Sequence, residues 1–292
     1  MLALELHAPI EAALARLRAG RGERCFSELT FSNLYLFRAV HQHRHVPGPW
    51  PGVAGAGYDG ARYFQPLFDV AEAPQAVLQR LLAEHGLLYP LDERQATALA
   101  ARGLATTASR DDADYLYPAS QLADYTGRAL AKKRNQVRQL LARCTPTALP
   151  YGQALEGEAR QVLAGWMAQK GKAGGAADEA ACLEALSLAG GLALAGFVHF
   201  DGGRPIGFVL GQWLEPGVVA IRFAKGLDAY PGIYPFMFRH FSLECERHFG
   251  QGARWLNFEQ DMGNPGMRRS KMSFAPAALL PKWRASLRPG PP

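Results

Sequence analysis

Residues 193–213 read ALAGFVHFDGGRPIGFVLGQW, and the fold class follows from this stretch and its continuation. The two apolar runs on either side of Asp201-Gly-Gly-Arg204 predict a β-hairpin, because a short Gly-rich turn between apolar runs is typical of antiparallel strands. Three further elements are predicted: a strand at Gly217–Ala224, a helix at Ile233–Phe249 and a strand at Arg254–Phe258. This order indicates an α+β (mixed α/β) fold and not a doubly wound parallel sheet.

Similar patterns extend in both directions from this stretch. Towards the C-terminus, Gly266–Ser273 predicts a short basic helix and Ala277–Trp283 a closing strand. In the first half, apolar spacing and turn residues predict helices at Pro9–Arg18, Phe26–Val40, Pro74–His85 and Asp92–Arg102, and strands at Gly52–Tyr58, Arg62–Val70 and Leu104–Ser109.

One long basic helix is predicted at Gln121–Arg143, with Asp124 as its single acidic residue. Pro146 and Pro150 end it, because proline cannot continue a helix. The change in composition predicts two lobes, residues 1–145 and 146–292.

Composition excludes several classes of protein. The chain has 292 residues, of which 48% are hydrophobic and 20% charged, so it is neither disordered nor a small disulfide scaffold. The four cysteines are scattered and His41, His43 and His45 alternate, so no metal site is expected. No stretch reaches the roughly 18 apolar residues of a membrane span, and residues 1–7 lack the features of a signal peptide. We therefore expect a cytoplasmic protein without a transmembrane segment.

Several segments carry a resemblance to a known family. The order of elements resembles that of the GNAT superfamily of acyltransferases. More specifically, the sequence resembles the soluble C-terminal part of phosphatidylglycerol lysyltransferases and their free-standing relatives. The segments that carry this resemblance are Phe26–Tyr35, Ala131–Val137, Arg222–Lys225, Tyr230–Phe236, Leu256–Gly263 and Pro265–Pro276.

The resemblance implies two GNAT-like lobes in tandem and a transfer of an aminoacyl group from tRNA. In the aminoacylating members a basic helix helps to hold the aminoacyl-tRNA, and the acceptor is a lipid hydroxyl. This chain lacks the transmembrane region of those members, so the resemblance does not by itself assign a lipid acceptor.

The candidate catalytic residues are Glu259 and Asp261, which follow an apolar strand, together with Asn257. Carboxylates at i and i+2 can face one cleft, and one of them can act as a general base on an attacking amine or hydroxyl. Asn257 can orient a carbonyl group. The alternative is structural: Asp261 pairs with a nearby arginine and caps the following helix.

Six residues are candidates for binding the donor or substrate, and they are Arg222, Lys225, Gly232, Tyr234, Arg268 and Lys271. In GNAT enzymes the turn that corresponds to Tyr230–Phe236 is Gly-rich, and its N–H groups hold the pyrophosphate of coenzyme A. Here Pro235 lacks that donor, which weakens an acyl-CoA grip. The alternatives are a plain helix start at Gly232, ion pairs of Arg222 and Lys225 with Glu259 or Asp261, and solvated charges on the short basic helix.

Arg128, Lys132, Lys133 and Arg134 of the long basic helix are candidates for contacting tRNA or phosphate. Clustered cations follow a phosphate backbone, whereas the stacking aromatic residues that bind bases are absent. The alternative is a solvated helix face.

The sequence thus predicts an acyl- or aminoacyl-transferase that requires no cofactor and uses aminoacyl-tRNA or acyl-CoA as co-substrate. The acceptor is an amine or a hydroxyl. The competing hypothesis is a non-catalytic GNAT-like module that binds RNA or an anionic lipid surface through its basic helix.

Overall fold

The computed structural model describes residues 1–171 and 178–288, which form two compact units. Unit 1 consists of Met1–Asp114, Gln260–Pro265 and the chain from Leu279 onwards. Unit 2 consists of Tyr115–Glu259 and Gly266–Ala278. The chain therefore leaves unit 1, builds unit 2, and returns to unit 1 twice.

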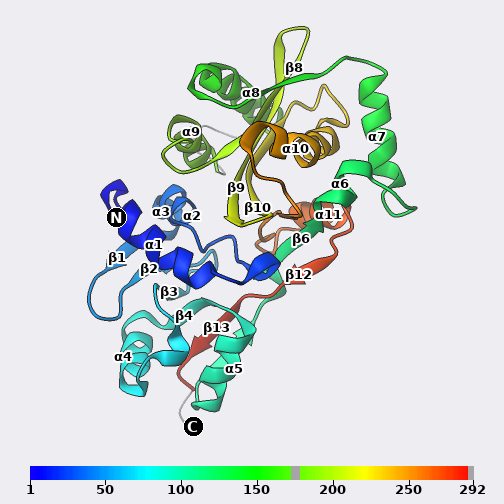
Figure 1. Ribbon diagram of the computed structural model, residues 1–292. Helices are drawn as coiled ribbons and strands as arrows, with labels where there is room; N and C mark the ends of the chain where they lie inside the picture. The colour runs from blue at the N-terminus through cyan, green and yellow to red at the C-terminus, as the bar shows by residue number, and fades with distance from the viewer. Residues whose placement is uncertain (172–177, 289–292) are drawn as a thin grey trace. The chain divides into compact units, whose positions relative to one another are not determined.

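Unit 1 is built on a six-stranded mixed sheet with the order β1-β2-β3-β4-β13-β5 (Figure 1). Its strands are β1 (Arg44–Val46), β2 (Gly52–Ala56), β3 (Arg62–Pro66), β4 (Leu87–Leu91), β5 (Ala105–Ala108) and β13 (Trp283–Ser286). Its helices are α1 (His7–Arg18), α2 (Phe31–Leu36), α3 (Arg38–His41), α4 (Gln75–His85) and α5 (Glu93–Ala101). The C-terminal strand β13 lies between β4 and β5 and is antiparallel to both.

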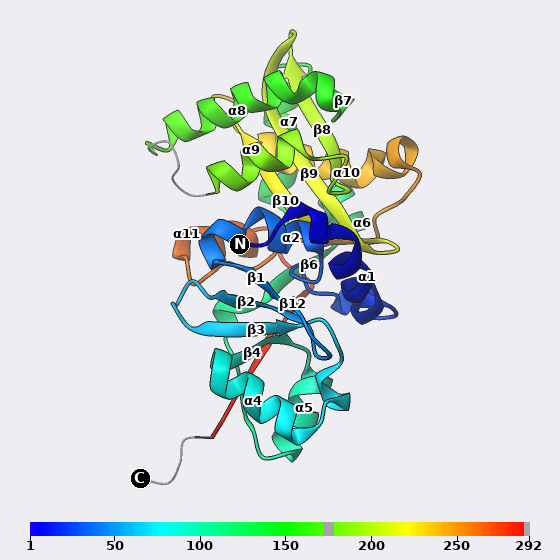
Figure 2. The same cartoon turned by 90° about the vertical axis from the view of Figure 1, so that its left-hand side faces the viewer.

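The two faces of this sheet differ in character. Phe64 and Leu88 point into an apolar core with Leu82 and Leu99 from α4 and α5, which cover this face (Figure 2). Because side chains alternate along a strand, their neighbours Tyr63 and Tyr89 lie on the opposite face.

Unit 2 contains most of a seven-stranded mixed sheet with the order β12-β6-β11-β10-β9-β8-β7. Its strands are β6 (Asp114–Pro118), β7 (Thr147–Pro150), β8 (Ala195–Asp201), β9 (Arg204–Glu215), β10 (Val218–Gly226), β11 (Trp255–Asn257) and β12 (Ala278–Leu280). The helices of this part are α6 (Ala119–Asp124), α7 (Ala131–Leu141), α8 (Glu156–Gln169), α9 (Glu179–Ser187), α10 (Ile233–Phe249) and α11 (Pro265–Met272). The predicted fold class is confirmed: both sheets are mixed and flanked by helices.

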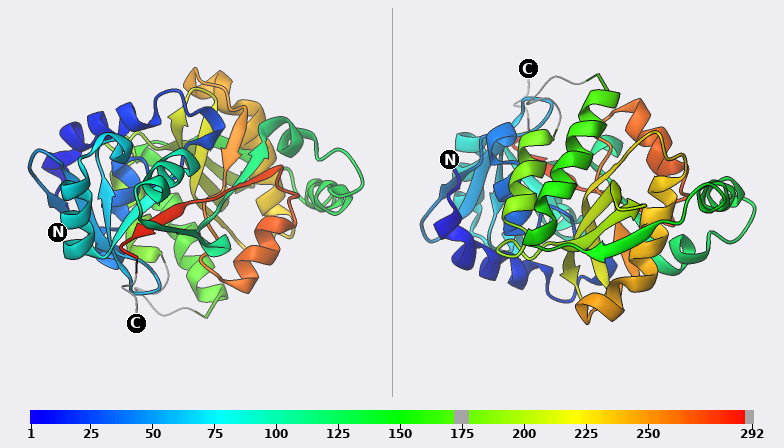
Figure 3. Two further views of the ribbon diagram at one scale, coloured as in Figure 1. Left: turned by 90° about the horizontal axis from the view of Figure 1, so that it is seen from below. Right: turned by 90° about the horizontal axis from the view of Figure 1, so that it is seen from above.

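Helices cover both faces of the central strands of unit 2. Figure 3 shows α8 and α9 side by side on one face and α10 on the other. Two glycines of β9 allow α10 to lie close to the sheet. A Cβ atom at Gly207 would lie 2.7 Å from the Met237 sulfur, and one at Gly211 would lie 3.1 Å from the Phe241 ring.

The predicted helix at Gln121–Arg143 is wrong as a single element, because it is divided into α6 and α7. Tyr125 takes a left-handed conformation (φ 50°) that ends α6, and Gly127 is also left-handed (φ 82°). The Arg134 guanidinium donates to the carbonyl oxygens of both residues and so stabilises the turn. Side-chain periodicity does not show this break, since the basic pattern continues through it. The predicted helix at Phe26–Val40 is likewise interrupted, at Phe37, between α2 and α3.

The unit boundary lies between Asp114 and Tyr115 and not after residue 145. Long-range contacts set this boundary. Strand β6 pairs with β11, with Tyr117 opposite Leu256, and helix α7 packs against α10. Those partners lie more than 90 residues later in the sequence than α7 and β6, so composition around residue 145 does not reveal them.

His199 of β8 is a fully buried histidine beneath α10. Its ring lies 5.0 Å from that of His240 and 5.7 Å from that of Phe236. Burial lowers the pKa of His199 to about 3, and burial lowers the pKa of His240 as well. Other charged groups near this cluster are Arg239, Glu244 and His248. The folded protein therefore holds His199 neutral.

We expect His199→Phe to reduce the acid sensitivity of unit 2. In the unfolded chain His199 binds a proton below pH 6.5, whereas the folded state does so near pH 3. The contribution of neutral His199 to stability is thus present above pH 6.5 and falls by about 1.4 kcal/mol per pH unit below it. Urea denaturation of wild type and variant from pH 7 to pH 4.5 measures this slope. The control is His45→Phe, a change at a partly exposed histidine. If the free energy of unfolding falls equally with decreasing pH in wild type and in His199→Phe, His199 is not the source of the acid sensitivity.

Candidate active site

Glu259 has an unusual backbone conformation directly after β11. Its φ of 57° lies in the left-handed region, which non-glycine residues rarely adopt. Its N–H donates to the Asn257 side-chain oxygen (2.7 Å), and its carbonyl accepts from the Lys271 ammonium (3.1 Å) and the Tyr115 N–H (3.3 Å). The predicted residues Asn257, Glu259 and Lys271 are thus brought together, and they fix the Glu259 backbone from both sides.

Arg222 of β10 holds the Glu259 carboxylate. Its NH1 donates to the Glu259 Oε1 at 2.5 Å, and its Nε and NH2 donate to the Gln212 Oε1 at 3.2 and 2.9 Å. Gln212 of β9 is anchored in turn, because its Nε2 donates to the Leu192 carbonyl (3.3 Å). The guanidinium is therefore part of a fixed frame that orients the carboxylate.

Exposure differs between the two partners of this pair. The Arg222 side chain is fully buried, whereas 19% of the Glu259 side chain is exposed. Carboxylate oxygens that are held by a buried guanidinium and still reach solvent can accept a proton or a hydrogen bond from a bound molecule. Arg222 is thus placed to orient the Glu259 carboxylate, which keeps an accessible position, and a direct contact of Arg222 with substrate remains a prediction.

Lys271 and Arg268 lie on α11. The Lys271 ammonium lies 5.6 Å from the centre of the Tyr115 ring, and its carbonyl accepts from the Tyr117 hydroxyl at 2.8 Å. Arg268 is half-buried. Lys271 thus contacts the Glu259 backbone, and a direct contact of either residue with a ligand remains a prediction.

Asp261 belongs to unit 1, whereas Glu259 belongs to unit 2. The Asp261 side chain is fully buried; it pairs with Arg110 (3.1 Å) and accepts from the Gly263 N–H (3.0 Å). The predicted pair of carboxylates is therefore not contained in either unit. Within unit 2 the exposed carboxylate of the predicted pair is that of Glu259.

Lys225 has a different partner from the one predicted. Its ammonium donates to both carboxylate oxygens of Asp178 at 2.8 Å and lies 3.9 Å from the centre of the Trp166 ring. The predicted ion pair with Glu259 or Asp261 is wrong for this lysine. Asp178 precedes α9 in the sequence, and strand periodicity in β10 gives no information about it.

The turn before α10 is closed by contacts within the protein. Gly232 is left-handed (φ 99°), and a Cβ atom there would lie 2.3 Å from the Gln136 carbonyl of α7. The Ile233 N–H donates to the Tyr230 carbonyl, and the Tyr234 hydroxyl accepts from the Gly226 N–H. Pro235 has no N–H to offer. This favours the structural interpretation of Gly232 and Tyr234 over a pyrophosphate-binding turn.

The basic residues around α7 divide into two groups. Lys133 lies 3.7 Å from the centre of the Phe274 ring, and burial, followed by the neighbouring Lys132, lowers its pKa to about 8. Arg134 stabilises the turn before the helix. Arg128 and Lys132, by contrast, are exposed, as is Arg138. The second group is thus more exposed to solvent than Lys133 and Arg134.

Gln212 is a member of this frame that was not among the predicted site residues. The signal was a polar residue inside the apolar run PIGFVLGQW, since a buried amide requires hydrogen-bond partners. Lys282, a lysine in the predicted closing strand, was overlooked for the same reason. It is fully buried in unit 1.

Residues 22–286 match the protein family described as phosphatidylglycerol lysyltransferase, C-terminal. This match spans most of the chain and includes the Arg222–Glu259 frame. The chain belongs to this family. A search of curated proteins gives no match.

Solved structures similar to this family member share its fold. A conserved protein of unknown function from Bacteroides thetaiotaomicron is 22% identical, with a TM-score of 0.80 and 98% of each chain covered. L-PGS from Bacillus licheniformis is 13% identical, with a TM-score of 0.56 and coverage of 89% of this chain and 93% of that one. FemX is 9% identical, with a TM-score of 0.62 and coverage of 98% and 96%. At these identities the likeness establishes the fold and nothing about substrates.

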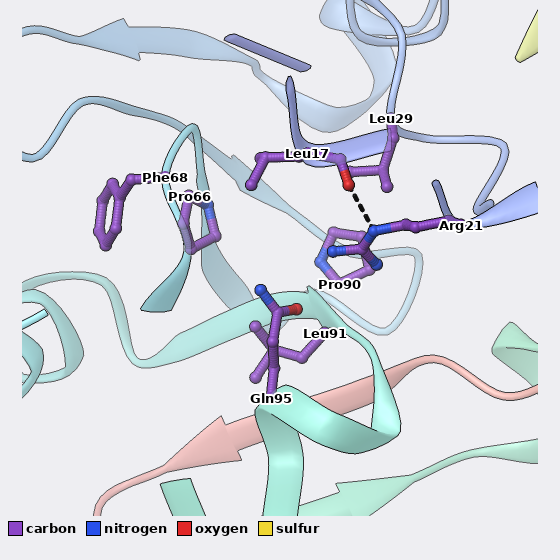
Figure 4. A pocket seen from close by; sticks show the side chains of 8 residues that line it. All are labelled: Leu17, Arg21, Leu29, Pro66, Phe68, Pro90, Leu91 and Gln95. Carbon is purple, nitrogen blue, oxygen red and sulfur yellow. Dashed lines mark hydrogen bonds between the residues drawn. The ribbon is translucent and has the colours of Figure 1, made fainter. Parts of the chain in front are cut away.

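A small pocket of this family member lies in unit 1, away from the predicted residues (Figure 4). It is lined by Leu17, Arg21, Leu29, Pro66, Phe68, Pro90, Leu91 and Gln95. Its cavity volume of about 10 Å³ is near the minimum for one water molecule. The Arg21 side chain donates to the Leu17 carbonyl and pairs with Asp92. The pocket is therefore a packing defect and not a substrate site.

Within residues 1–171 and 178–288, no helix combines the length and apolar character that a membrane span requires. In the same residues, no group of three or more histidine, cysteine or acidic side chains is arranged to hold a metal ion.

We expect Glu259→Gly to be more stable than Glu259→Ala. Both changes remove the carboxylate, but glycine adopts a φ of 57° without strain, whereas alanine retains the cost, so the difference in free energy of unfolding is about 1 kcal/mol. Urea denaturation of the two variants measures this difference. Equal stabilities would show that the left-handed conformation is not a source of strain.

Proposed function

We propose that this protein is an aminoacyltransferase in which Glu259 receives the proton of the attacking group. The observation that carries the proposal is the geometry of Glu259: a non-glycine residue in a strained conformation, fixed by Asn257, Lys271 and Arg222, with its carboxylate partly exposed. Strained residues held by their surroundings are concentrated at functional sites. Membership of a family named for lysyl transfer supports the same conclusion.

In the proposed reaction a hydroxyl or amine attacks the carbonyl carbon of an aminoacyl ester. A new bond forms between that carbon and the attacking atom, and the ester bond to the carrier breaks. Glu259 accepts the proton of the nucleophile and returns it to the departing oxygen, so it is unchanged after each cycle. Arg222 and Gln212 keep the carboxylate oriented, and no covalent enzyme intermediate is required.

The donor that we propose is aminoacyl-tRNA and not acyl-CoA. This proposal is supported by the turn before α10, where the Ile233 and Phe236 N–H groups donate within the protein, Pro235 has no N–H, and α7 packs against Gly232. Exposed Arg128, Lys132 and Arg138 supply positive charge suited to an RNA backbone. The family name makes a lysyl group and the hydroxyl of phosphatidylglycerol the first pair to test.

We expect Glu259→Gln to reduce the transfer rate by about 100-fold or more, because the amide cannot accept the proton. The measurement follows radiolabelled lysine from charged tRNA to phosphatidylglycerol vesicles, and in parallel to soluble amines. Glu244→Gln, an isosteric change on α10, is the matched control and should keep full activity. Equal rates for Glu259→Gln and wild type would remove Glu259 from the mechanism, and a lack of transfer to every acceptor would contradict the enzyme proposal.

The alternative of a non-catalytic binder is favoured by one observation, the exposed cations around α7. Within residues 1–171 and 178–288, Arg128, Lys132 and Arg138 have no acidic partner. These exposed cations on and just before α7 suit the phosphates of RNA or of an anionic lipid surface whether or not transfer follows.

We expect the triple change Arg128→Ala, Lys132→Ala and Arg138→Ala to weaken tRNA binding and to flatten its salt dependence. Each lost phosphate contact lowers the slope of log K against log salt by about 1, so the slope should fall by about 3. Fluorescence anisotropy with labelled tRNA at 50 to 300 mM salt measures it. Arg16→Ala, Arg24→Ala and Arg80→Ala, three exposed arginines of unit 1, form the control. An unchanged slope in the α7 variant would exclude this surface, and loss of binding without any detectable transfer would favour the binder.

A further inference from the structure

A buried lysine joins all three chain segments of unit 1. The Lys282 ammonium donates to Glu28 from the N-terminal segment and pairs with Asp114 (2.6 Å), the last residue before the chain enters unit 2. It also donates to the side-chain oxygen of Gln260 (3.0 Å), the first residue on the return. Lys282 itself directly precedes β13. All three N–H donors of the ammonium therefore have an acceptor, each from a different part of the sequence.

The cluster contains one more carboxylate than it has ammonium groups. Lys282 and Asp114 are fully buried, and 14% of the Glu28 side chain is exposed. With both carboxylates ionised, the three groups carry a net charge of −1 within the protein, which is costly. One proton on a carboxylate makes the cluster neutral.

Ser27 indicates where that proton is held. Its N–H donates to Asp114 at 2.9 Å, and its hydroxyl lies 3.2 Å from both an Asp114 oxygen and a Glu28 oxygen. A hydroxyl has one proton, so two ionised carboxylates compete for it. If Glu28 carries a proton, it donates to the Ser27 oxygen while the Ser27 hydroxyl donates to Asp114. Every contact is then satisfied.

We infer that Glu28, Ser27, Asp114 and Lys282 form a pH-sensitive latch, which secures β13 in the six-stranded sheet when Glu28 is protonated and loosens it when Glu28 is ionised. β13 depends on this latch because it is a four-residue strand inserted between β4 and β5, far from its neighbours in sequence. The Lys282 contacts hold in place the residue that directly precedes β13.

The electrostatics of the cluster agree with this assignment. Burial raises the pKa of Glu28 to about 7, with Lys282 acting to lower it and Asp114 to raise it. The other titratable groups that face Glu28 are Tyr63 and Tyr89, and burial raises the pKa of both, so they remain neutral. Arg284 and Asp112 pair with each other (2.9 Å) at the edge of the cluster.

The sign of the pH effect follows from the raised pKa of Glu28. The Glu28 carboxyl binds its proton more tightly when β13 is secured in the sheet than when β13 is released. Protonation therefore stabilises the secured form fully below pH 4.5. The contribution is lost as the pH rises through about 7. Raising the pH therefore favours release of β13, and the opening equilibrium should increase about tenfold between pH 6 and pH 8.5.

Hydrogen exchange of the whole protein, followed by mass spectrometry, tests the latch. The observable is protection of the peptide that covers 279–288 between pH 6 and pH 8.5, corrected for the intrinsic pH dependence of exchange. We expect wild-type protection to fall about tenfold over this range and protection in Glu28→Gln to stay constant, because the amide mimics the protonated acid. Glu23→Gln, the same change at an exposed carboxylate of unit 1, should behave as wild type.

Two results would overturn the latch. One is a wild-type protection of the 279–288 peptide that does not change with pH. This result would contradict the latch even if Glu28→Gln fails to fold. The other is an equal pH dependence in wild type and Glu28→Gln, which would assign the effect to another group. A peptide from β9 in unit 2 reports whether any change is confined to unit 1.

Discussion

The fold of unit 1 depends on the charge contacts of Lys282. A unit assembled from three separate pieces of chain requires something that joins them. Here one ammonium of the C-terminal piece contacts the first piece through Glu28 and Asp114 and the second through Gln260. Removing the Lys282 ammonium would leave two carboxylates without their cation, which is far more costly than replacing the whole cluster by apolar residues. The cluster therefore specifies which segments belong together more than it adds stability.

The Arg222 frame in unit 2 uses the same physical principle for a different purpose. The buried Arg222 guanidinium donates hydrogen bonds to Gln212 and to Glu259. Of the charged pair, only the Glu259 side chain is partly exposed to solvent. The strained backbone at Glu259 is held by three neighbouring groups. In a stable structure such strain persists only where surrounding contacts impose it. Asp261 differs from Glu259 in that its own carboxylate is fully buried and pairs with the partly exposed Arg110.

Several of these residues lie in the predicted region of the chain but have partners other than the predicted ones. Arg222 and Glu259 were expected to be near each other, and they are. Lys225 was expected to share the same acids, but it pairs with Asp178, which precedes another helix. The turn at Gly232 was weighed as either a ligand site or a helix start, and only the packing of α7 against it supplies a reason to prefer the second. The candidate site was thus predictable as a region and not as a set of contacts.

The sequence by itself predicted the order of helices and strands from β8 to α11, and with it the mixed α/β class. It did not predict β7, and the predicted closing strand at Ala277–Trp283 is divided into β12 and β13, which belong to different sheets. Hydrophobic periodicity is local and survives in any context. Only the tertiary structure decided which strands meet and which charges pair. Ser27 and Asp114 are 87 residues apart, and Glu28 and Lys282 are 254 apart. Polar contacts over such separations leave no periodic signal, because the two partners come together only when the chain folds.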